Sequence, residues 1–221
     1  MSDTVKMILS FACCMSSAGL FISPFPTFRK ILANRSVQHF RVDPYVASML
    51  NCAFLIIYGV VNSDNKLVIF VNSVGLGFQI AYLLIFLYYA DIKKKLGYWL
   101  GAAVAFFAAY SLVFLLALHD PKKKRVAFGV ISTVFHITMY GFPLVILKKV
   151  IDTGSVEFMP LYLSVGLFVN SAVWLGYAAF PFDIYRMIGN GFGVLLSLLQ
   201  IRIYCHYKSS DPVLPGAVIL E

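Results

Sequence analysis

Residues 43–59 read DPYVASMLNCAFLIIYG, and residues 162–178 read YLSVGLFVNSAVWLGYA, an apolar stretch with an asparagine and a tyrosine in matching places. The spacing between the copies is constant, because 170 − 51 = 177 − 58 = 119. Further pairs repeat at this offset or at one residue less: Pro24 and Pro143, Ser36-Val37 and Ser155-Val156, Asn72 and Asn190, Gly75 and Gly193. The chain therefore contains two copies of one apolar unit, and each copy keeps polar amides.

The composition indicates an integral membrane protein. Hydrophobic residues make up 60% of the chain and charged residues 13%, and the mean hydropathy is +0.83. A soluble domain of this size needs a more polar surface. Ten-residue alternating segments typical of transmembrane barrels are absent. Seven segments are long and apolar enough to span a bilayer as helices: 7–27, 44–62, 67–90, 96–118, 126–147, 160–180 and 186–207.

The first segment lacks the basic start and the small-residue cleavage site of a signal peptide, so we expect it to be a mature helix. We interpret residues 208–221 as a cytosolic tail, because they are too short to span the bilayer. The four cysteines have no metal-ligand spacing, and we predict neither a metal site nor a cofactor.

Lysine and arginine near the predicted helix ends are unequally shared between the two faces. Eleven would lie on one face: Arg29, Lys30, Arg35, Arg41, Lys93, Lys94, Lys95, Lys148, Lys149, Arg202 and Lys208. Seven would lie on the other: Lys6, Lys66, Lys122, Lys123, Lys124, Arg125 and Arg186. Because cytosolic loops are richer in these residues, we expect an outside or lumenal N-terminus and a cytosolic C-terminus. The net charge of +8 does not indicate nucleic-acid binding, since no continuous basic stripe is present.

The fourth segment, 96–118, has no partner in the repeat and adds one crossing between the copies. The copies are therefore predicted to be parallel, as two three-helix bundles joined by a linker helix in a 3+1+3 plan. The predicted divisions are 1–95 for the first repeat, 96–120 for the linker, 121–207 for the second repeat, and then the tail. A solute route between the halves is expected, and the linker helix is expected to be structural.

The chain resembles the SWEET sugar transporters from about residue 7 to residue 207. The motifs that carry the resemblance are SPFPTFRKI at 23–31, DPYVASMLNCAFLIIYG at 43–59, VNSVG at 71–75, MYGFPLVILKKVIDTGSVEFMPL at 139–161 and IGNGFG at 188–193. This family is among the transporters built from parallel repeats. The resemblance implies a seven-helix facilitator that carries mono- or disaccharides by alternating access. Transport runs in either direction across the membrane, depending on which way the sugar gradient points.

The resemblance also implies roles for individual residues. Asn72 and Asn190 would face the substrate, with Trp174 as the pocket aromatic and Leu55 at the equivalent position of the first copy. The four hinge prolines would be Pro24, Pro44, Pro143 and Pro160. Tyr58, Tyr177 and Asp183 would lie near the outer gate. The chain departs from the family at Gly189, often proline, and at Ser73, often glycine, and either change could alter local unwinding beside the amides.

The residue chemistry agrees with a sugar site. An amide offers two donors and two acceptor lone pairs without charge, which suits the hydroxyl groups of a neutral solute. Trp174 offers an apolar face to a sugar ring and an indole N–H to a hydroxyl. The alternative for Asn72 and Asn190 is hydrogen bonding between packed helices. We assign that packing role to Asn51, Asn170, Gln79 and Gln200. Because Leu55 and Trp174 are bulky, we expect a monosaccharide such as glucose.

Prolines inside helices remove a backbone hydrogen bond and create pliable points. For Pro44 and Pro160 the alternative stays open that each only starts a helix, where proline is tolerated. Pro26 has no assigned role. Each Asp and Glu lies at a predicted helix end or in a loop, which favours facilitated diffusion over proton coupling. We interpret His136 as a hydrogen-bonded structural residue.

Three other classes of membrane protein fit the sequence less well. A carrier of another small neutral solute, such as an amino acid, is the nearest alternative, although the Pro-Gln dipeptides of one such carrier group are absent. A seven-helix receptor would not require duplicated triplets. A membrane enzyme is disfavoured, because no nucleophile, base or paired carboxylates stand at usable spacing. The expected partners are a sugar and the lipid bilayer, with a homo-oligomer possible, in a plasma or vacuolar membrane.

Overall fold

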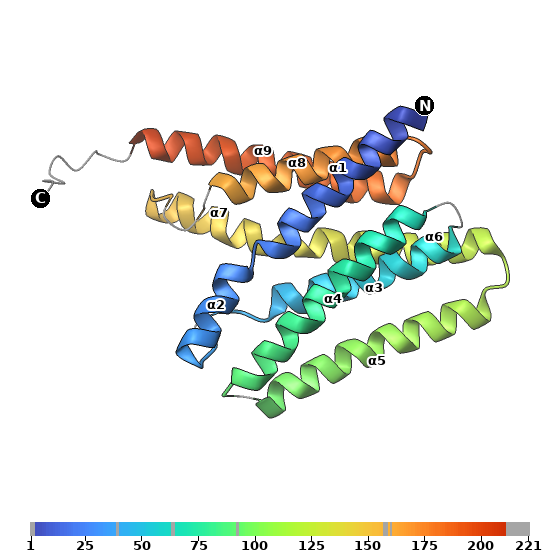
Figure 1. Cartoon of the computed structure of the whole chain (residues 1–221), viewed down its shortest axis with the longest axis horizontal. Coiled ribbons are helices and arrows are strands. Elements are labelled where there is room, and N and C mark those ends of the chain that lie inside the picture. Colours follow the sequence, from blue (N-terminus) through green and yellow to red (C-terminus); the bar gives the residue numbers. More distant parts are fainter. Residues whose placement is uncertain are drawn as a thin grey trace, which may run out of the picture.

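The structure is a computed structural model that describes residues 3–38, 40–62, 65–91, 93–156, 159 and 161–210. Within these residues the chain forms helices throughout its length (Figure 1). Their bounds are α1 Asp3–Ile22, α2 Phe25–Asn34, α3 Asp43–Val61, α4 Lys66–Tyr89, α5 Lys93–Ala117, α6 Pro121–Met139, α7 Gly141–Thr153, α8 Leu161–Ala178 and α9 Ile184–Ser210.

Seven stretches of the described chain are long and apolar enough to cross a membrane, as the sequence predicts. Five of them are single helices. The first, Asp3–Asn34, joins α1 to α2, and the fifth, Pro121–Thr153, joins α6 to α7. These two composite spans are longer than the predicted 7–27 and 126–147, because a second short helix continues each beyond a break. Each repeat thus opens with a broken helix.

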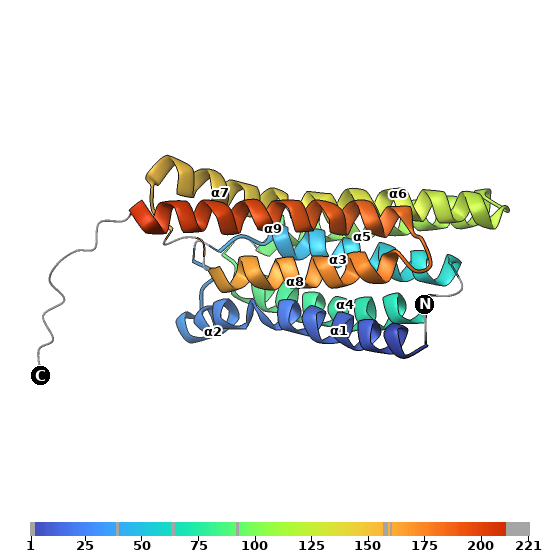
Figure 2. The ribbon, with the colours of Figure 1, turned by 90° about the horizontal axis from the view of Figure 1, so that it is seen from above.

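The two repeats run in parallel. In Figures 1 and 2 the composite spans α1–α2 and α6–α7 proceed in the same direction, and α3 and α8 both return in the opposite direction. Helix α5 makes the additional crossing that brings α6 to the same end as α1 (Figure 1). The predicted 3+1+3 arrangement is confirmed.

The halves meet through two equivalent helix pairs. Helix α1 packs against α8, and α6, its equivalent in the second repeat, packs against α3. Helix α5 contacts α3, α4 and α6, so it lies against one side of the bundle. Its aromatic side chains pack on Phe54 of α3, whose ring centroid lies 5.0 Å from that of Phe107 and 5.4 Å from that of Tyr110.

A pair of equivalent glycines explains the close approach of helices within each half. A Cβ at Gly75 of α4 would collide with the ring of Phe21, and a Cβ at Gly193 of α9 would collide with the hydroxyl of Tyr140. Phe21 and Tyr140 are themselves equivalent, since 140 − 21 = 119. In both halves, therefore, a glycine of the third helix makes room for an aromatic side chain of the first span, and the two helices can approach closely.

The helix breaks coincide with two of the predicted hinge prolines. Pro24 stands between α1 and α2, and the hydroxyl of Ser23 donates to the carbonyl of Leu20 at 2.8 Å. That carbonyl is the one that a residue-24 N–H would otherwise bond. Pro143 lies in the first turn of α7, directly after the break at Tyr140.

The other prolines occupy helix starts or fall outside the described chain. Pro44 is the second residue of α3 and Pro26 the second residue of α2, where the missing N–H costs nothing. Of the two readings left open for Pro44, the structure favours the start of a helix. Pro160 lies outside the described residues.

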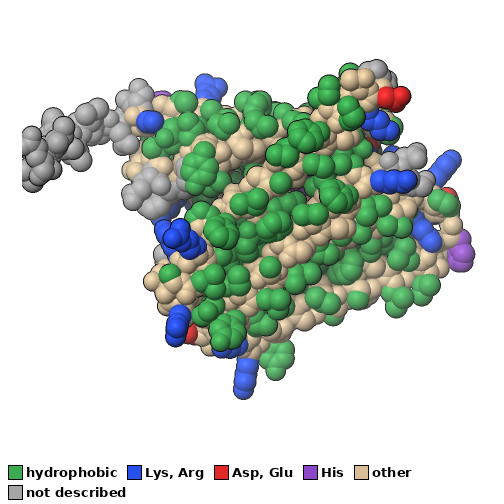
Figure 3. Space-filling model, viewed as in Figure 1, with side chains coloured by type: hydrophobic (Ala, Val, Ile, Leu, Met, Phe, Trp, Pro, Cys, Tyr) green, Lys and Arg blue, Asp and Glu red, His purple; other side chains and the backbone are tan. Residues whose placement is uncertain are grey.

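Apolar side chains cover the face seen in Figure 3, and the lysines and arginines gather towards the two ends. Such a distribution suits a bilayer around the middle of the bundle. Arg186 is an exception, because its side chain is only 4% exposed and bonds Asp183. Arg186, one of the seven basic residues assigned to the outer face, therefore lies inside the protein rather than on its surface.

Candidate functional site

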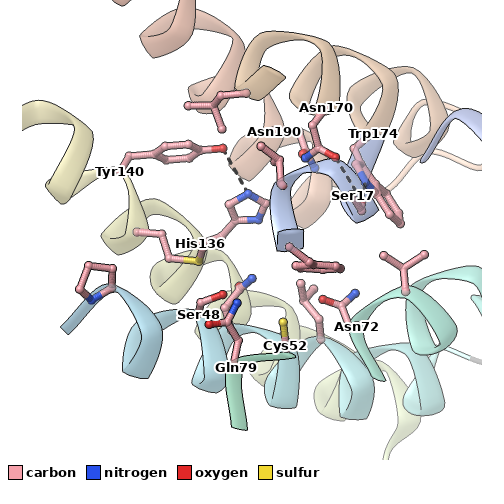
Figure 4. Close-up of a pocket in the computed structure, with 18 of the residues that line it drawn as sticks. Ser17, Ser48, Cys52, Asn72, Gln79, His136, Tyr140, Asn170, Trp174 and Asn190 are labelled. Carbon is pink, nitrogen blue, oxygen red and sulfur yellow. Dashed lines mark hydrogen bonds between the residues drawn. The ribbon is translucent and has the colours of Figure 1, made fainter. Parts of the chain in front are cut away.

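A cavity of about 280 Å³ lies between the two halves (Figure 4). The predicted substrate residues Asn72, Asn190, Trp174 and Leu55 all line it. Two of the predicted hinge prolines, Pro24 and Pro44, line it as well. Pro143, Tyr58, Tyr177 and Asp183 are not among its lining residues.

The two predicted amides approach the cavity from opposite sides, Asn72 from α4 and Asn190 from α9 (Figure 4). Each Nδ2 donates to the carbonyl four residues earlier at 2.8 Å, that of Val68 for Asn72 and that of Arg186 for Asn190. An amide has a second N–H and an oxygen beyond that bond, and these are the groups available to a ligand. The equivalent bonds hold both amides in equivalent orientations.

The departures at Ser73 and Gly189 do not unwind the helices beside the amides. Helix α4 continues through Ser73, and α9 continues through Gly189. At Gly189 the absence of a side chain makes room for His136, whose Nδ1 lies 3.1 Å from the place that a Cβ would occupy. His136 also lines the cavity and pairs with the Tyr140 hydroxyl at 3.2 Å, as its structural interpretation predicts.

Trp174 is held by a network between α8 and α1. Its indole Nε1 donates to the Ser17 hydroxyl at 2.8 Å, and that hydroxyl donates to Asn170 Oδ1 at 3.1 Å (Figure 4). The expectation that the indole N–H serves a sugar hydroxyl is therefore wrong for this conformation, because Ser17 already accepts it. With its N–H engaged, Trp174 lines the cavity with the carbon atoms of its ring.

Asn170 performs the packing role predicted for it, because it also accepts from the Ser16 hydroxyl at 3.0 Å. It lines the cavity nonetheless, as do Asn51 and Gln79. Gln200 is buried outside the cavity lining. The packing interpretation is thus consistent with the surroundings of Gln200 and Asn170. It did not predict that Asn51 and Gln79 line the cavity.

Sequence reasoning missed several lining residues that the repeat could have revealed. The offset of 119 relates Ser17 to His136, Leu20 to Met139 and Phe21 to Tyr140, and all six line the cavity. The first helix of each copy can be aligned by the same offset that relates Asn51 to Asn170. That alignment would have pointed to these three pairs. Ser48, Cys52 and Tyr45 also line the cavity from α3.

A buried polar cluster closes one end of the bundle beyond the amides. The Tyr58 hydroxyl donates to Asp183 Oδ2 at 2.7 Å, which links α3 of the first half to the segment before α9. Arg186 Nε donates to the same oxygen at 2.8 Å, and its guanidinium lies 5.4 Å from the centroid of the Tyr177 ring. The bond between Tyr58 and Asp183, two of the residues expected near the outer gate, joins the halves at this end.

The described residues contain no group of three His, Cys, Asp or Glu side chains that could hold a metal ion. Among the described lining residues, Arg186 is the one Lys, Arg, Asp or Glu. The others supply amides, hydroxyls, aromatic and aliphatic groups, the imidazole of His136, the thiol of Cys52 and the thioether of Met139. Amides and hydroxyls of this kind can hydrogen-bond a small polar ligand.

Comparisons with known proteins agree with this arrangement. A family model described as "Sugar efflux transporter for intercellular exchange" matches residues 7–94 and 126–211. The chain is 39% identical over 214 residues to the bidirectional sugar transporter SWEET7b of Oryza sativa subsp. indica, covering 95% of this chain and 80% of that protein. It is 38% identical over 201 residues to the bidirectional sugar transporter SWEET7 of Arabidopsis thaliana, covering 88% and 78%.

The fold is also similar to that of a eukaryotic SWEET transporter whose structure was solved at 3.7 Å resolution. The TM-score is 0.87 at 33% identity, and the likeness covers 94% of this chain and 98% of the other. The all-helical 3+1+3 fold expected from the repeat is therefore shared with a solved structure.

Proposed function

The chain belongs to the family of sugar efflux transporters for intercellular exchange, and we propose that it is a uniporter that carries monosaccharides such as glucose across a membrane in either direction. Its relatives are named bidirectional sugar transporters. The observation that carries the proposal is the cavity between the halves, which brings Asn72, Asn190 and Trp174 together. Two uncharged amides can hydrogen-bond ring hydroxyls, and the indole face can cover the C–H side of the ring.

The volume of the cavity supports a single sugar unit. At about 280 Å³ it is slightly smaller than the pockets of roughly 300–1,000 Å³ that hold drug-sized ligands. Trp174 and Leu55 narrow it from equivalent positions in the two halves, since 174 − 55 = 119. This narrowing supports the proposal that the cavity takes one sugar ring rather than two.

Alternating access is the proposed mechanism. The bond from Tyr58 to Asp183 joins the halves at one end, while the breaks at Pro24 and Tyr140 lie towards the other. Rocking of the halves about the breaks would open one end as the other closes. We propose that the closed end faces outside or the lumen, with the N-terminus there and the C-terminus in the cytosol, in a plasma or vacuolar membrane.

The test is counterflow of labelled glucose in proteoliposomes, with sucrose for comparison and with or without a pH gradient. We expect wild-type glucose exchange that is insensitive to the gradient, and loss of most exchange in Asn72→Ala and Asn190→Ala, because each removes a ligand hydrogen bond worth about tenfold or more in affinity. Gln200→Ala is the matched control, a buried amide outside the cavity lining. Normal exchange in both asparagine variants would show that the amides only pack helices.

A further inference from the structure

Arg186 is an unexplained charge at the edge of the cavity. It lines the cavity, is 5% exposed, and uses Nε to bond Asp183. Its Nη1 and Nη2 are buried and have no hydrogen-bond partner in the described chain. Leaving such donors unpaired costs free energy, and the cost is higher for a charged group. A ligand that supplies oxygen atoms to both nitrogens would remove that cost.

The charge around Arg186 favours a ligand with one negative charge. Asp183 carries the single carboxylate of the cluster, and it interacts with Arg125 as well as with Arg186. Two guanidinium groups and one carboxylate leave a net charge of +1. Arg186 lines the cavity and Asp183 does not, and Nη1 and Nη2 of Arg186 have almost no accessible surface in this conformation, so the guanidinium must turn towards the cavity to meet a ligand.

The repeat shows that this charge is an addition to one half. At the offset of 118 that relates Asn72 to Asn190, Arg186 corresponds to Val68 and Asp183 corresponds to Asn65. Val68 lines the cavity from the first half with an aliphatic side chain. The equivalent positions of the first half thus carry no charge, so the Asp183–Arg186 pair is a feature of the second half alone.

We propose that the cavity also takes a sugar acid, a monosaccharide with one carboxylate such as a hexuronate, whose carboxylate binds Nη1 and Nη2 of Arg186. A guanidinium matches the two oxygens of a carboxylate with two parallel hydrogen bonds. Asn190, whose Nδ2 donates to the Arg186 carbonyl, stands one helical turn further along α9 and meets the ring hydroxyls. The inference rests on the proposed function, because it assigns a substrate class to the same cavity.

A sugar acid fits this cavity better than an amino acid does, although both carry a carboxylate. An amino acid also brings an ammonium group, which needs a carboxylate or several strong acceptors when it leaves water. The described lining contains no Asp or Glu. The remaining polar groups, amides and hydroxyls, suit hydroxyl groups instead.

The first test compares two ligands on the wild-type protein. Glucuronate and glucuronamide have the same shape, but only glucuronate is charged. Binding is followed by quenching of Trp174 fluorescence in a Trp99→Phe background. Trp99, the other tryptophan, is exposed on α5 and does not line the cavity, so its fluorescence would obscure the signal. We expect glucuronate to bind at least about tenfold more tightly than glucuronamide. Equal binding of the two ligands would overturn the proposal.

The second test uses the double variant Asp183→Asn/Arg186→Val, which places the first half's residues in the second half. Removing Arg186 alone would leave a buried carboxylate without its partner, so both are changed. The preference for glucuronate should fall to within about twofold of glucuronamide. A preference that persists in this variant places the anion elsewhere. If the variant does not fold, the wild-type comparison still decides.

Two further arms separate the possible results. Glucose 6-phosphate binding more tightly than glucuronate would identify a phosphate ester and overturn the carboxylate assignment. Wild-type glucose counterflow, measured separately, tests the proposed function. Glucose exchange without a glucuronate preference rejects the sugar-acid site alone, whereas a glucuronate preference without glucose exchange supports that site and rejects neutral-sugar transport.

Discussion

Single residues decide the shape of the cavity, and Trp174 is one source of its asymmetry. The equivalent residue of the first half, Leu55, is smaller and has no polar atom in its side chain. Trp174 is locked in place by its bond to Ser17 and by the edge of the Tyr177 ring, whose centroid lies 5.8 Å away. A side chain held from two directions forms a rigid wall, and a rigid wall can exclude a second sugar unit.

Replacing Trp174 by leucine should therefore widen the range of sugars. In Trp174→Leu we expect glucose to bind about five- to tenfold more weakly, because the aromatic face is lost, and sucrose exchange to appear. Counterflow of both labelled sugars measures this. Trp99→Leu is the control, since it removes the other tryptophan, which is 68% exposed on α5. If Trp174→Leu still excludes sucrose, other residues set the size limit.

Tyr58 should stabilise the closed end through one buried hydrogen bond to a carboxylate. Tyr58→Phe removes that donor and should lower stability by about 1.5–3 kcal/mol, seen as a lower melting temperature in detergent. Tyr177→Phe is the matched control, because it keeps the ring beside Arg186 and Trp174. Equal melting temperatures for the two variants would show that the Tyr58–Asp183 bond does not hold the halves together.

The central residues of the cavity could be predicted because the same kind of residue occurs at the equivalent position of both copies. Asn72 and Asn190 share an offset, and so do the missed pairs such as Ser17 and His136. Arg186 could not be found in that way, since its equivalent is Val68 and a cation near a helix end usually lies in water. Its burial depends on Asp183, a tertiary contact that periodicity does not encode.

At the scale of the helices, the breaks divide each composite span into a longer helix, α1 or α6, and a shorter one, α2 or α7. Phe28 of α2 stacks on Tyr82 of α4 with centroids 4.1 Å apart, so α2 is anchored to the first half. The sequence predicted pliable points at Pro24 and Pro143, but it did not predict that separate helices continue beyond them. That continuation depends on packing partners such as Tyr82, which lie far along the chain.

Pro24→Ala should stiffen the first composite span. Alanine at 24 supplies an N–H to the Leu20 carbonyl, which now accepts the Ser23 hydroxyl, and it favours a continuous helix. We expect glucose exchange to slow several-fold while glucose affinity changes little. Pro26→Ala is the control, because Pro26 lies in the first turn of α2, where no N–H is needed. Equal exchange rates in both variants would remove Pro24 from the hinge.

For the whole molecule, orientation follows from the parallel repeat and the distribution of charge. The described chain has seven membrane-spanning stretches, so residues 3 and 210 are expected on opposite sides of the membrane, and labelling one position near each end of the bundle determines the orientation. Lys94 at the start of α5 and Lys123 at the start of α6 are exposed and lie at opposite ends of the linker crossing. The charge bias predicts that Lys94 is cytosolic and Lys123 is outside or lumenal.

The orientation can be measured by cysteine labelling in a background where the four native cysteines are replaced by alanine. In right-side-out vesicles a membrane-impermeant maleimide should label Lys123→Cys and leave Lys94→Cys unlabelled until the membrane is permeabilised. The reverse pattern would invert the protein and place the Tyr58–Asp183 closure on the cytosolic side. With Arg186 buried, six basic residues remain for the outer surface against eleven for the cytosolic one, so the predicted charge bias keeps its direction.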